Sequence, residues 1–127
     1  SKQDVLNEWR AAAEKKIRLQ LEKDLQGVPA AEMGKISVAY EPIWAIGTGR
    51  NATAGQAQEV HHFIRQTLLG MAPGNTIKIL YGGSVKPENS LELLSQEDIS
   101  GVLVGGASLK VETFSVIIQN ALKLLNA

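Results

Sequence analysis

The stretch of sequence that decides the fold reads Ile36-Ser37-Val38-Ala39-Tyr40-Glu41-Pro42-Ile43-Trp44-Ala45-Ile46-Gly47-Thr48-Gly49. It opens with a short, mostly apolar run containing β-branched residues, which is typical of a β-strand. Pro42 lacks the N–H that a sheet ladder needs, and it favours an extended backbone at Glu41. We therefore predict a strand whose C-terminal end carries the carboxylate of Glu41.

The residues after Pro42 predict a loop that can close over a site. Four apolar residues, too few for a helix of their own, precede a Gly-Thr-Gly segment and Arg50-Asn51. A general base at the mouth of a parallel sheet, followed by a loop that excludes water, suits proton abstraction from a carbon beside a carbonyl group. The alternative is a strand that ends in a solvated glutamate before an ordinary turn, since most glutamates are exposed.

Length and composition predict one globular domain over residues 1–127. Hydrophobic residues make up 44% of the chain and charged residues 20%, and 13 basic side chains balance 13 acidic ones. This balance offers no basic surface for nucleic acid or an anionic membrane. The sequence has no cysteine, which excludes disulfides and thiolate metal sites. No apolar run reaches the ~18 residues that cross a bilayer, so we expect a soluble, cytoplasmic protein.

An amphipathic helix is predicted over residues 4–26, with Asp4 as its N-cap and Gly27 as its stop. Its apolar residues recur every three or four positions, which places them on one face. They are Val5, Trp9, Ala12, Ala13, Ile17, Leu21 and Leu25. We expect Trp9 to fill the core.

A second helix is predicted over residues 54–69, with Thr53 as its cap. His61 and His62 lie on this helix. Adjacent helical residues point about 100° apart and neither histidine has a second ligand at i+4, so a metal site is disfavoured. We expect an exposed or partly packed pair of histidines.

Two more strands are predicted over residues 77–81 and 101–104, each followed by a helix. The first of these helices covers residues 87–96 and the second covers residues 111–125. On the last helix, the side chains expected to face inward are those of Phe114, Ile117, Ile118, Ala121, Leu122 and Leu125. Helical crossovers between successive strands predict a parallel sheet in an α/β fold, with the C-terminal ends of all strands at one edge.

Each of the two later strands ends in a glycine pair that a serine soon follows, at Gly82-Gly83-Ser84 and at Gly105-Gly106-Ala107-Ser108. Glycines let backbone N–H groups approach an anion closely, and the start of the following helix adds a positive dipole end. Two such loops beside Glu41 predict a phosphate site that holds charge by dipoles, without a lysine cluster. For either pair alone, plain turn chemistry is the alternative.

Three motifs closely resemble those of the triosephosphate isomerase family. They are residues 39–49, Tyr81-Gly82-Gly83-Ser84-Val85 and Leu103-Val104-Gly105-Gly106-Ala107-Ser108-Leu109, in the family's order and spacing. The resemblance covers almost the whole chain and implies the C-terminal half of a (β/α)8 TIM barrel. The half would begin just after the family's fifth strand. It would form one partial-barrel domain over residues 1–127, with a helix followed by three parallel strands that alternate with helices.

The resemblance implies that Glu41 is the base that interconverts dihydroxyacetone phosphate and glyceraldehyde 3-phosphate through an enediolate, a step of glycolysis and gluconeogenesis. No metal and no organic cofactor are implied. The backbone N–H groups of Gly47, Ser84, Gly105 and Gly106 would hold the substrate phosphate.

The resemblance also implies a closing lid, whose residues are Pro42, Ile43, Trp44, Ala45, Ile46, Gly47, Thr48 and Gly49. Tyr81 and Ser84 would contact the lid in its closed state. Arg50-Asn51 departs from the Lys-Thr pair that the family often has at the far hinge, a difference that concerns lid kinetics. Arg65 and Asp98 would form an ion pair between two helical regions.

The lysine, asparagine and histidine that complete the family's active site belong to an N-terminal half that this chain lacks. We therefore expect the chain alone to be inactive. Its implied partners are a triose phosphate substrate and the missing N-terminal half of the barrel or a complementary fragment, in a family that is usually homodimeric. Two alternatives remain open: a non-catalytic phosphate-binding half-barrel that self-associates, and a structural or interaction protein that kept the scaffold.

Overall fold

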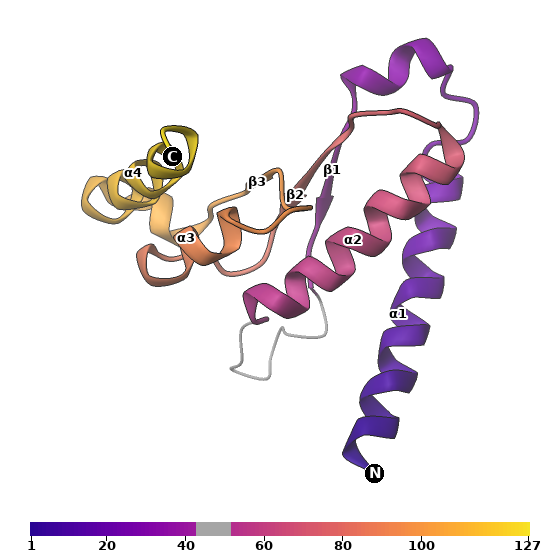
Figure 1. The fold of residues 1–127 in the computed structure, drawn as a ribbon, viewed down its shortest axis with the longest axis horizontal. Coiled ribbons are helices and arrows are strands. Elements are labelled where there is room, and N and C mark those ends of the chain that lie inside the picture. Colours follow the sequence, from indigo (N-terminus) through magenta and orange to yellow (C-terminus); the bar gives the residue numbers. More distant parts are fainter. Residues whose placement is uncertain (43–51) are drawn as a thin grey trace.

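The computed structural model describes residues 1–42 and 52–127, in which helices alternate with strands (Figure 1). Its elements are α1 (Lys2–Asp24), the 3₁₀ helix η1 (Ala30–Lys35), β1 (Ser37–Tyr40), α2 (Ala54–Met71), β2 (Lys78–Tyr81), α3 (Pro87–Leu94), β3 (Gly101–Val102), the 3₁₀ helix η3 (Gly106–Leu109) and α4 (Val111–Leu125). In Figure 1, α1 and α2 lie together at one end of the molecule, and α3 and α4 lie at the other.

The strands of the described part form one parallel sheet in the order β1-β2-β3. Ser37 pairs with Lys78 at one end of the β1–β2 ladder, and Tyr40 pairs with Tyr81 at the other. This sheet confirms the predicted α/β class and is the arrangement of a partial (β/α)8 barrel. The third strand is shorter than residues 101–104, because β2 ends at Tyr81 and gives β3 only two residues of pairing.

The starts of two helices are fixed by capping boxes. Thr53 caps α2 as predicted: its hydroxyl accepts the N–H of Gln56 at 3.1 Å, while the Gln56 side chain accepts the N–H of Thr53 at 3.0 Å. The prediction for α1 was wrong by three residues. Ser1 is the cap, and Asp4 is the partner three positions on, bonded through its backbone N–H and its carboxylate.

Two apolar clusters hold the described elements together. The first joins α1, η1, α2 and β2 through Ile17, Leu21, Leu25, Met33, Ile64, Leu68, Ile77 and Ile79. The second joins α2, β2, α3 and α4 through Ala54, Ala57, Tyr81, Val85, Leu93, Ile99 and Ile117. Because α2 and β2 contribute to both clusters, they connect the two ends of the molecule.

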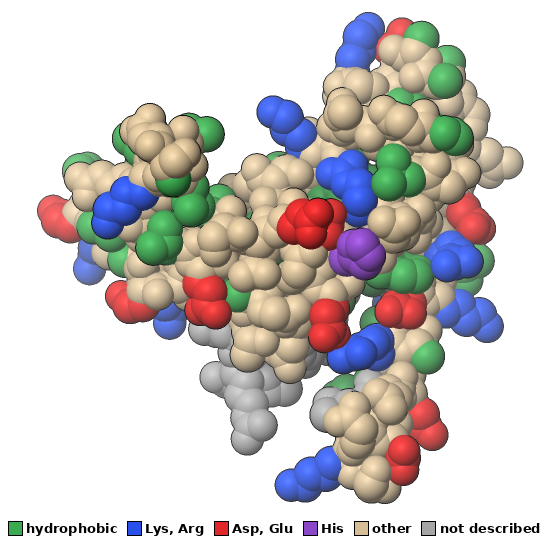
Figure 2. Space-filling model, in the orientation of Figure 1, with side chains coloured by type: hydrophobic (Ala, Val, Ile, Leu, Met, Phe, Trp, Pro, Cys, Tyr) green, Lys and Arg blue, Asp and Glu red, His purple; other side chains and the backbone are tan. Residues whose placement is uncertain are grey.

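Some apolar side chains predicted to be buried are exposed. Trp9 is 62% exposed, because the N-terminal part of α1 extends past the cluster that buries Ile17, Leu21 and Leu25. On α4, Ile117 is buried against α3, whereas the other large inward candidates are exposed. Their exposed fractions are 36% for Phe114, 45% for Ile118, 49% for Leu122 and 79% for Leu125. The described residues cover this side of α4 only in part, and Figure 2 shows hydrophobic side chains at the surface of the end of the molecule where α4 lies.

His61 and His62 have opposite environments, so the expectation of an exposed or partly packed pair fails for His61. His61 is fully buried between the rings of Tyr40 and Tyr81, at centroid distances of 6.1 and 6.0 Å. Its Nδ1 lies 3.3 Å from the backbone oxygen of Asp98. Burial lowers the pKa of His61 from 6.5 to about 4, although Asp98 opposes the shift.

The ion pair expected between Arg65 and Asp98 is absent from the described part of the chain. The Asp98 carboxylate instead accepts Gln58 Nε2 at 2.6 Å and lies 3.0 Å from His62 Nδ1. Gln58 also accepts the backbone N–H of Asp98 at 2.9 Å. These contacts occupy the carboxylate, and the buried Nη1 of Arg65 has no hydrogen-bond partner among the described residues.

The buried, neutral state of His61 predicts a pH-dependent stability. Between pH 6.5 and about 4, this side chain binds a proton in the unfolded chain but not in the folded one. The free energy of unfolding should therefore fall as the pH drops through this window, by on the order of 3 kcal/mol in total. Urea denaturation at a series of pH values measures this slope.

The variant His61→Gln should flatten that slope, because it removes the buried ring that stays neutral in the folded chain. An unchanged slope in His61→Gln would contradict the assignment to the buried ring.

Gly83 predicts a steric penalty for any side chain at its position. A Cβ there would overlap the hydroxyl of Tyr81 and lie 3.0 Å from Cγ of Pro42. Tyr81 is only 1% exposed and has little room to move. Gly83→Ala should lower the free energy of unfolding by about 1–3 kcal/mol in urea denaturation. Gly34→Ala is the control, since a Cβ at Gly34 meets nothing within 4 Å; equal losses in both variants would refute the steric explanation.

Candidate active site

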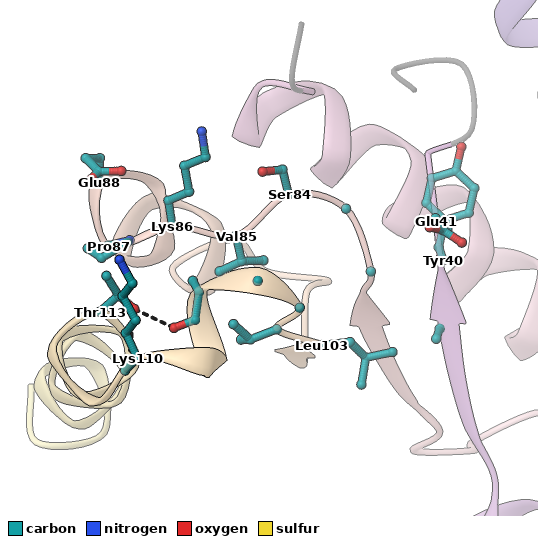
Figure 3. Close-up of a pocket in the computed structure, with 17 residues that line it drawn as sticks. Tyr40, Glu41, Ser84, Val85, Lys86, Pro87, Glu88, Leu103, Lys110 and Thr113 are labelled. Carbon is teal, nitrogen blue, oxygen red and sulfur yellow. Dashed lines mark hydrogen bonds between the residues drawn. The ribbon is translucent and has the colours of Figure 1, made fainter. Parts of the chain in front are cut away.

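A cavity of about 860 Å³ lies where the three strands end (Figure 3). Its wall combines the end of β1, the loop between β2 and α3, and the loop between β3 and α4. Glu41, Ser84, Gly105 and Gly106, four of the residues singled out in the sequence, all line it. The structure thus brings the carboxylate and both glycine pairs to a single concave surface, as a parallel sheet requires.

Glu41 is held against the first glycine loop by a backbone hydrogen bond. The N–H of Gly82 donates to the carbonyl of Tyr40 at 2.8 Å, which continues the ladder beyond the last paired residues. A Cβ on Gly82 would lie 3.2 Å from that same carbonyl oxygen and 3.9 Å from Cα of Glu41. The Glu41 side chain is exposed, whereas Pro42 behind it is buried.

Three backbone N–H groups on the cavity wall are available to bind an anion, and that of Gly82 is not one of them. The Gly82 N–H is committed to Tyr40, but the N–H groups of Ser84, Gly105 and Gly106 donate to no other described residue. All three residues are exposed and line the cavity. Unengaged backbone N–H groups at a concave surface are suitable donors for a phosphate.

Two lysines on the cavity wall were not anticipated from the sequence. Lys86 and Lys110 line the cavity, and Figure 3 shows both on the side opposite Glu41. Each follows a glycine pair within four residues and immediately precedes a helix. That shared spacing was the available signal. The wall therefore offers two cations in addition to backbone dipoles, with Glu88 as a nearby opposing charge.

The residues predicted to contact the lid differ in exposure. Tyr81 is 1% exposed, and burial together with Tyr40 raises the pKa of its hydroxyl above 10. Ser84 is exposed on the cavity wall. Of the lid itself only Pro42 is described; Ile43, Trp44, Ala45, Ile46, Gly47, Thr48, Gly49 and the hinge pair Arg50-Asn51 lie outside the described residues.

The described residues lack two features that would indicate other classes of site. They contain no cluster of three or more His, Asp or Glu side chains able to hold a metal ion. None of their helices combines the length and the apolar character needed to cross a membrane.

Comparison with known proteins agrees with the motifs. The sequence model of the triosephosphate isomerase family matches residues 4–121. The chain is 55% identical over 108 residues to the triosephosphate isomerase of Trichlorobacter lovleyi, covering 83% of this chain and 43% of that protein. It is 50% identical over 109 residues to the triosephosphate isomerase of Carboxydothermus hydrogenoformans, covering 84% of this chain and 43% of that protein.

The chain spans about two fifths of the length of these relatives. Within that span, the match includes the end of β1 and both glycine loops, so it covers the described residues that line the cavity. The chain therefore belongs to the triosephosphate isomerase family.

Proposed function

We propose that this chain supplies the general base and the phosphate-binding loops of a triosephosphate isomerase. The observation that carries the proposal is the placement of Glu41 on the same cavity as the unengaged amides of Ser84, Gly105 and Gly106. In (β/α)8 barrels the active site lies at the C-terminal ends of the strands, which is where this cavity opens. Family membership names the reaction that such a site performs in relatives.

The proposed chemistry is a proton transfer between neighbouring carbons of dihydroxyacetone phosphate and glyceraldehyde 3-phosphate. The Glu41 carboxylate takes the proton from the carbon beside the carbonyl group, and the C–H electron pair forms the enediolate. The protonated side chain then returns the proton to the neighbouring carbon, and a proton moves from the substrate's hydroxyl oxygen to its former carbonyl oxygen, so that the hydroxyl and carbonyl groups exchange places. The amides of Ser84, Gly105 and Gly106, joined by Gly47 of the lid, would hold the phosphate and so fix the reacting carbons at Glu41.

Closure of the loop is part of the proposal because Glu41 is exposed in the described structure. Residues 42–49 would cover the cavity and exclude water, while Tyr81 and Ser84 would contact the closed loop. Exclusion of water strengthens the interaction of fixed donors with the developing charge of an enediolate. The Arg50-Asn51 pair would set how readily the loop moves.

Completion of the site requires groups from outside this chain. A (β/α)8 barrel has eight strands, and the described residues provide three. We propose that the N-terminal half of the barrel, or a complementary fragment, supplies the lysine and the histidine that polarise the substrate carbonyl. Loss of one such donor typically lowers kcat by about 10²–10³, so the chain alone should not turn over. Cytoplasmic location and homodimeric assembly of the completed enzyme belong to the same proposal.

A second candidate is a non-catalytic phosphate-binding half-barrel that self-associates. The exposed apolar side of α4 favours it, since Ile118, Leu122 and Leu125 are 45%, 49% and 79% exposed. In this case a second copy would cover α4, and Glu41 would face phosphate without a reaction to catalyse.

An assay of reconstituted isomerase activity tests the first proposal. The chain is mixed with the N-terminal half of the Trichlorobacter lovleyi relative, and isomerisation of glyceraldehyde 3-phosphate is followed. We expect no turnover from either piece and measurable turnover from the mixture. Glu41→Gln in this chain should lower that turnover by about 10²–10⁴, because the general base is lost.

Glu32→Gln is the matched control, since Glu32 is an exposed carboxylate of η1, outside the cavity. Equal turnover with Glu41→Gln and with the unaltered chain would refute the assignment of the base. A mixture without turnover, combined with a phosphate-binding dimer in light scattering of the chain alone, would favour the self-associating half-barrel.

A further inference from the structure

In each glycine loop, a backbone carbonyl accepts a hydrogen bond from a side chain of the helix that follows. We call these two side chains, Asn89 and Thr113, the braces. The third residue of α3 is Asn89, and the third residue of α4 is Thr113. Asn89 Nδ2 donates to the carbonyl of Ser84 at 3.0 Å, and its Oδ1 accepts the N–H of Lys86 at 2.7 Å. Thr113 Oγ1 lies 2.5 Å from the carbonyl oxygen of Ala107 and 3.1 Å from that of Lys110.

These hydrogen bonds engage backbone carbonyl oxygens of the two loops, which would repel a bound anion. A carbonyl oxygen carries partial negative charge and repels phosphate, so a loop binds an anion only while its N–H groups, and not its carbonyls, face the ligand. Asn89 engages the carbonyl of Ser84, and Thr113 engages that of Ala107 on the cavity wall. Figure 3 labels Thr113 and marks its hydrogen bond with a dashed line. The carbonyl of Gly105 is engaged within its own loop, by the hydroxyl of Ser108 at 2.6 Å.

The amides beside these carbonyls stay unengaged. The N–H groups of Ser84, Gly105 and Gly106 donate to no other described residue, although a hydrogen-bonded carbonyl lies on the same residue or on a neighbouring one. A peptide unit is planar and joins the carbonyl of one residue to the N–H of the next, so the bond from Ser108 to the Gly105 carbonyl directly orients the N–H of Gly106. The bonds from Asn89 and Thr113 restrict the backbone rotations that follow the N–H groups of Ser84 and Gly106. The braces therefore determine which face of the loop backbone meets the cavity.

We propose that Asn89 and Thr113 are a matched pair of positioning residues, each holding one glycine loop in the form that receives phosphate. The inference rests on the proposed function, because it assigns these residues to the phosphate site of that function. Neither side chain needs to touch the phosphate. Each acts through the backbone of the loop that precedes its helix.

The chain contains the same kinds of bond away from the cavity, which provides matched controls. Asn75, before β2, donates from Nδ2 to the carbonyls of Leu68 and Ala72 at 2.8 and 2.7 Å and accepts the N–H of Ile77 at 3.1 Å. Thr67 Oγ1 donates to the carbonyl of Phe63 at 2.9 Å. Substitution of Asn75 or Thr67 should therefore lower stability while leaving the hydrogen bonds of both glycine loops intact.

The experiment is a titration of the full chain with inorganic phosphate, followed by the ¹⁵N–¹H amide signals of Ser84, Gly105 and Gly106. Asn89→Ala and Thr113→Val should each weaken the Kd for phosphate about three- to tenfold, which corresponds to one modest hydrogen bond. Thr113→Ser keeps the hydroxyl and should restore the original Kd. Thermal melts of all variants report stability separately.

Asn75→Ala and Thr67→Val should lower the melting temperature while leaving the Kd for phosphate within about twofold of the original. A Kd that is unchanged in both Asn89→Ala and Thr113→Val would overturn the positioning role while leaving the phosphate site intact. A Kd that weakens equally in the two control variants would also overturn it, by showing a general effect of stability. Absence of any phosphate-induced shift in the unaltered chain would overturn the proposed phosphate site and the positioning role together.

Discussion

The hydrogen bond from the N–H of Gly82 to the carbonyl of Tyr40 is the contact on which the candidate site depends. It extends the β1–β2 ladder past its last paired residues, so the first glycine loop leaves the sheet directly beside Glu41. The loop can pass so close because Gly82 and Gly83 have no side chains to collide with Tyr40, Tyr81 or Pro42. The carboxylate of Glu41 and the first glycine loop are therefore positioned by sheet geometry and not by contacts between their own side chains.

The order of elements was predictable from the sequence because local signals decide it. Thr53 and Gln56 form the cap of α2, and α4 covers the predicted residues, since capping and periodicity act within a few residues. The cap of α1 was placed at Asp4 because both ends of a capping box carry side chains able to cap; the structure uses Ser1. The glycine pairs were equally visible, because each interrupts an apolar run where a strand must end.

The wrong predictions concern which side chains are buried, because the periodicity of a helix does not show which other elements pack against it. An apolar face shows that a helix has something to bury, but not whether another element covers it, so Trp9 and Leu122 were assigned to the core and are exposed. The burial of His61 was not predictable because histidine occurs both at the surface and in the core. In the structure it is buried because the rings of Tyr40 and Tyr81 pack against it. The two braces were not predicted because their roles depend on side chains that reach back to the preceding loop. Lys86 and Lys110 were not predicted because their spacing after the glycine pairs does not show that they line the cavity.

Each brace and the loop it holds belong to one strand–loop–helix unit, so the proposed phosphate site would be built from two such units. Asn89 reaches only the loop before α3, and Thr113 reaches only the loop before α4. In the proposed phosphate site the two loops would act as two arms of a chelate, whose combined affinity for one ligand exceeds that of either arm, because the second arm binds at a high effective concentration. The two arms are linked behind the cavity, because Asn120 of α4 donates to the hydroxyl of Ser90 in α3 at 2.9 Å and both helices share one apolar cluster, so a sequence change in one unit is transmitted to the other.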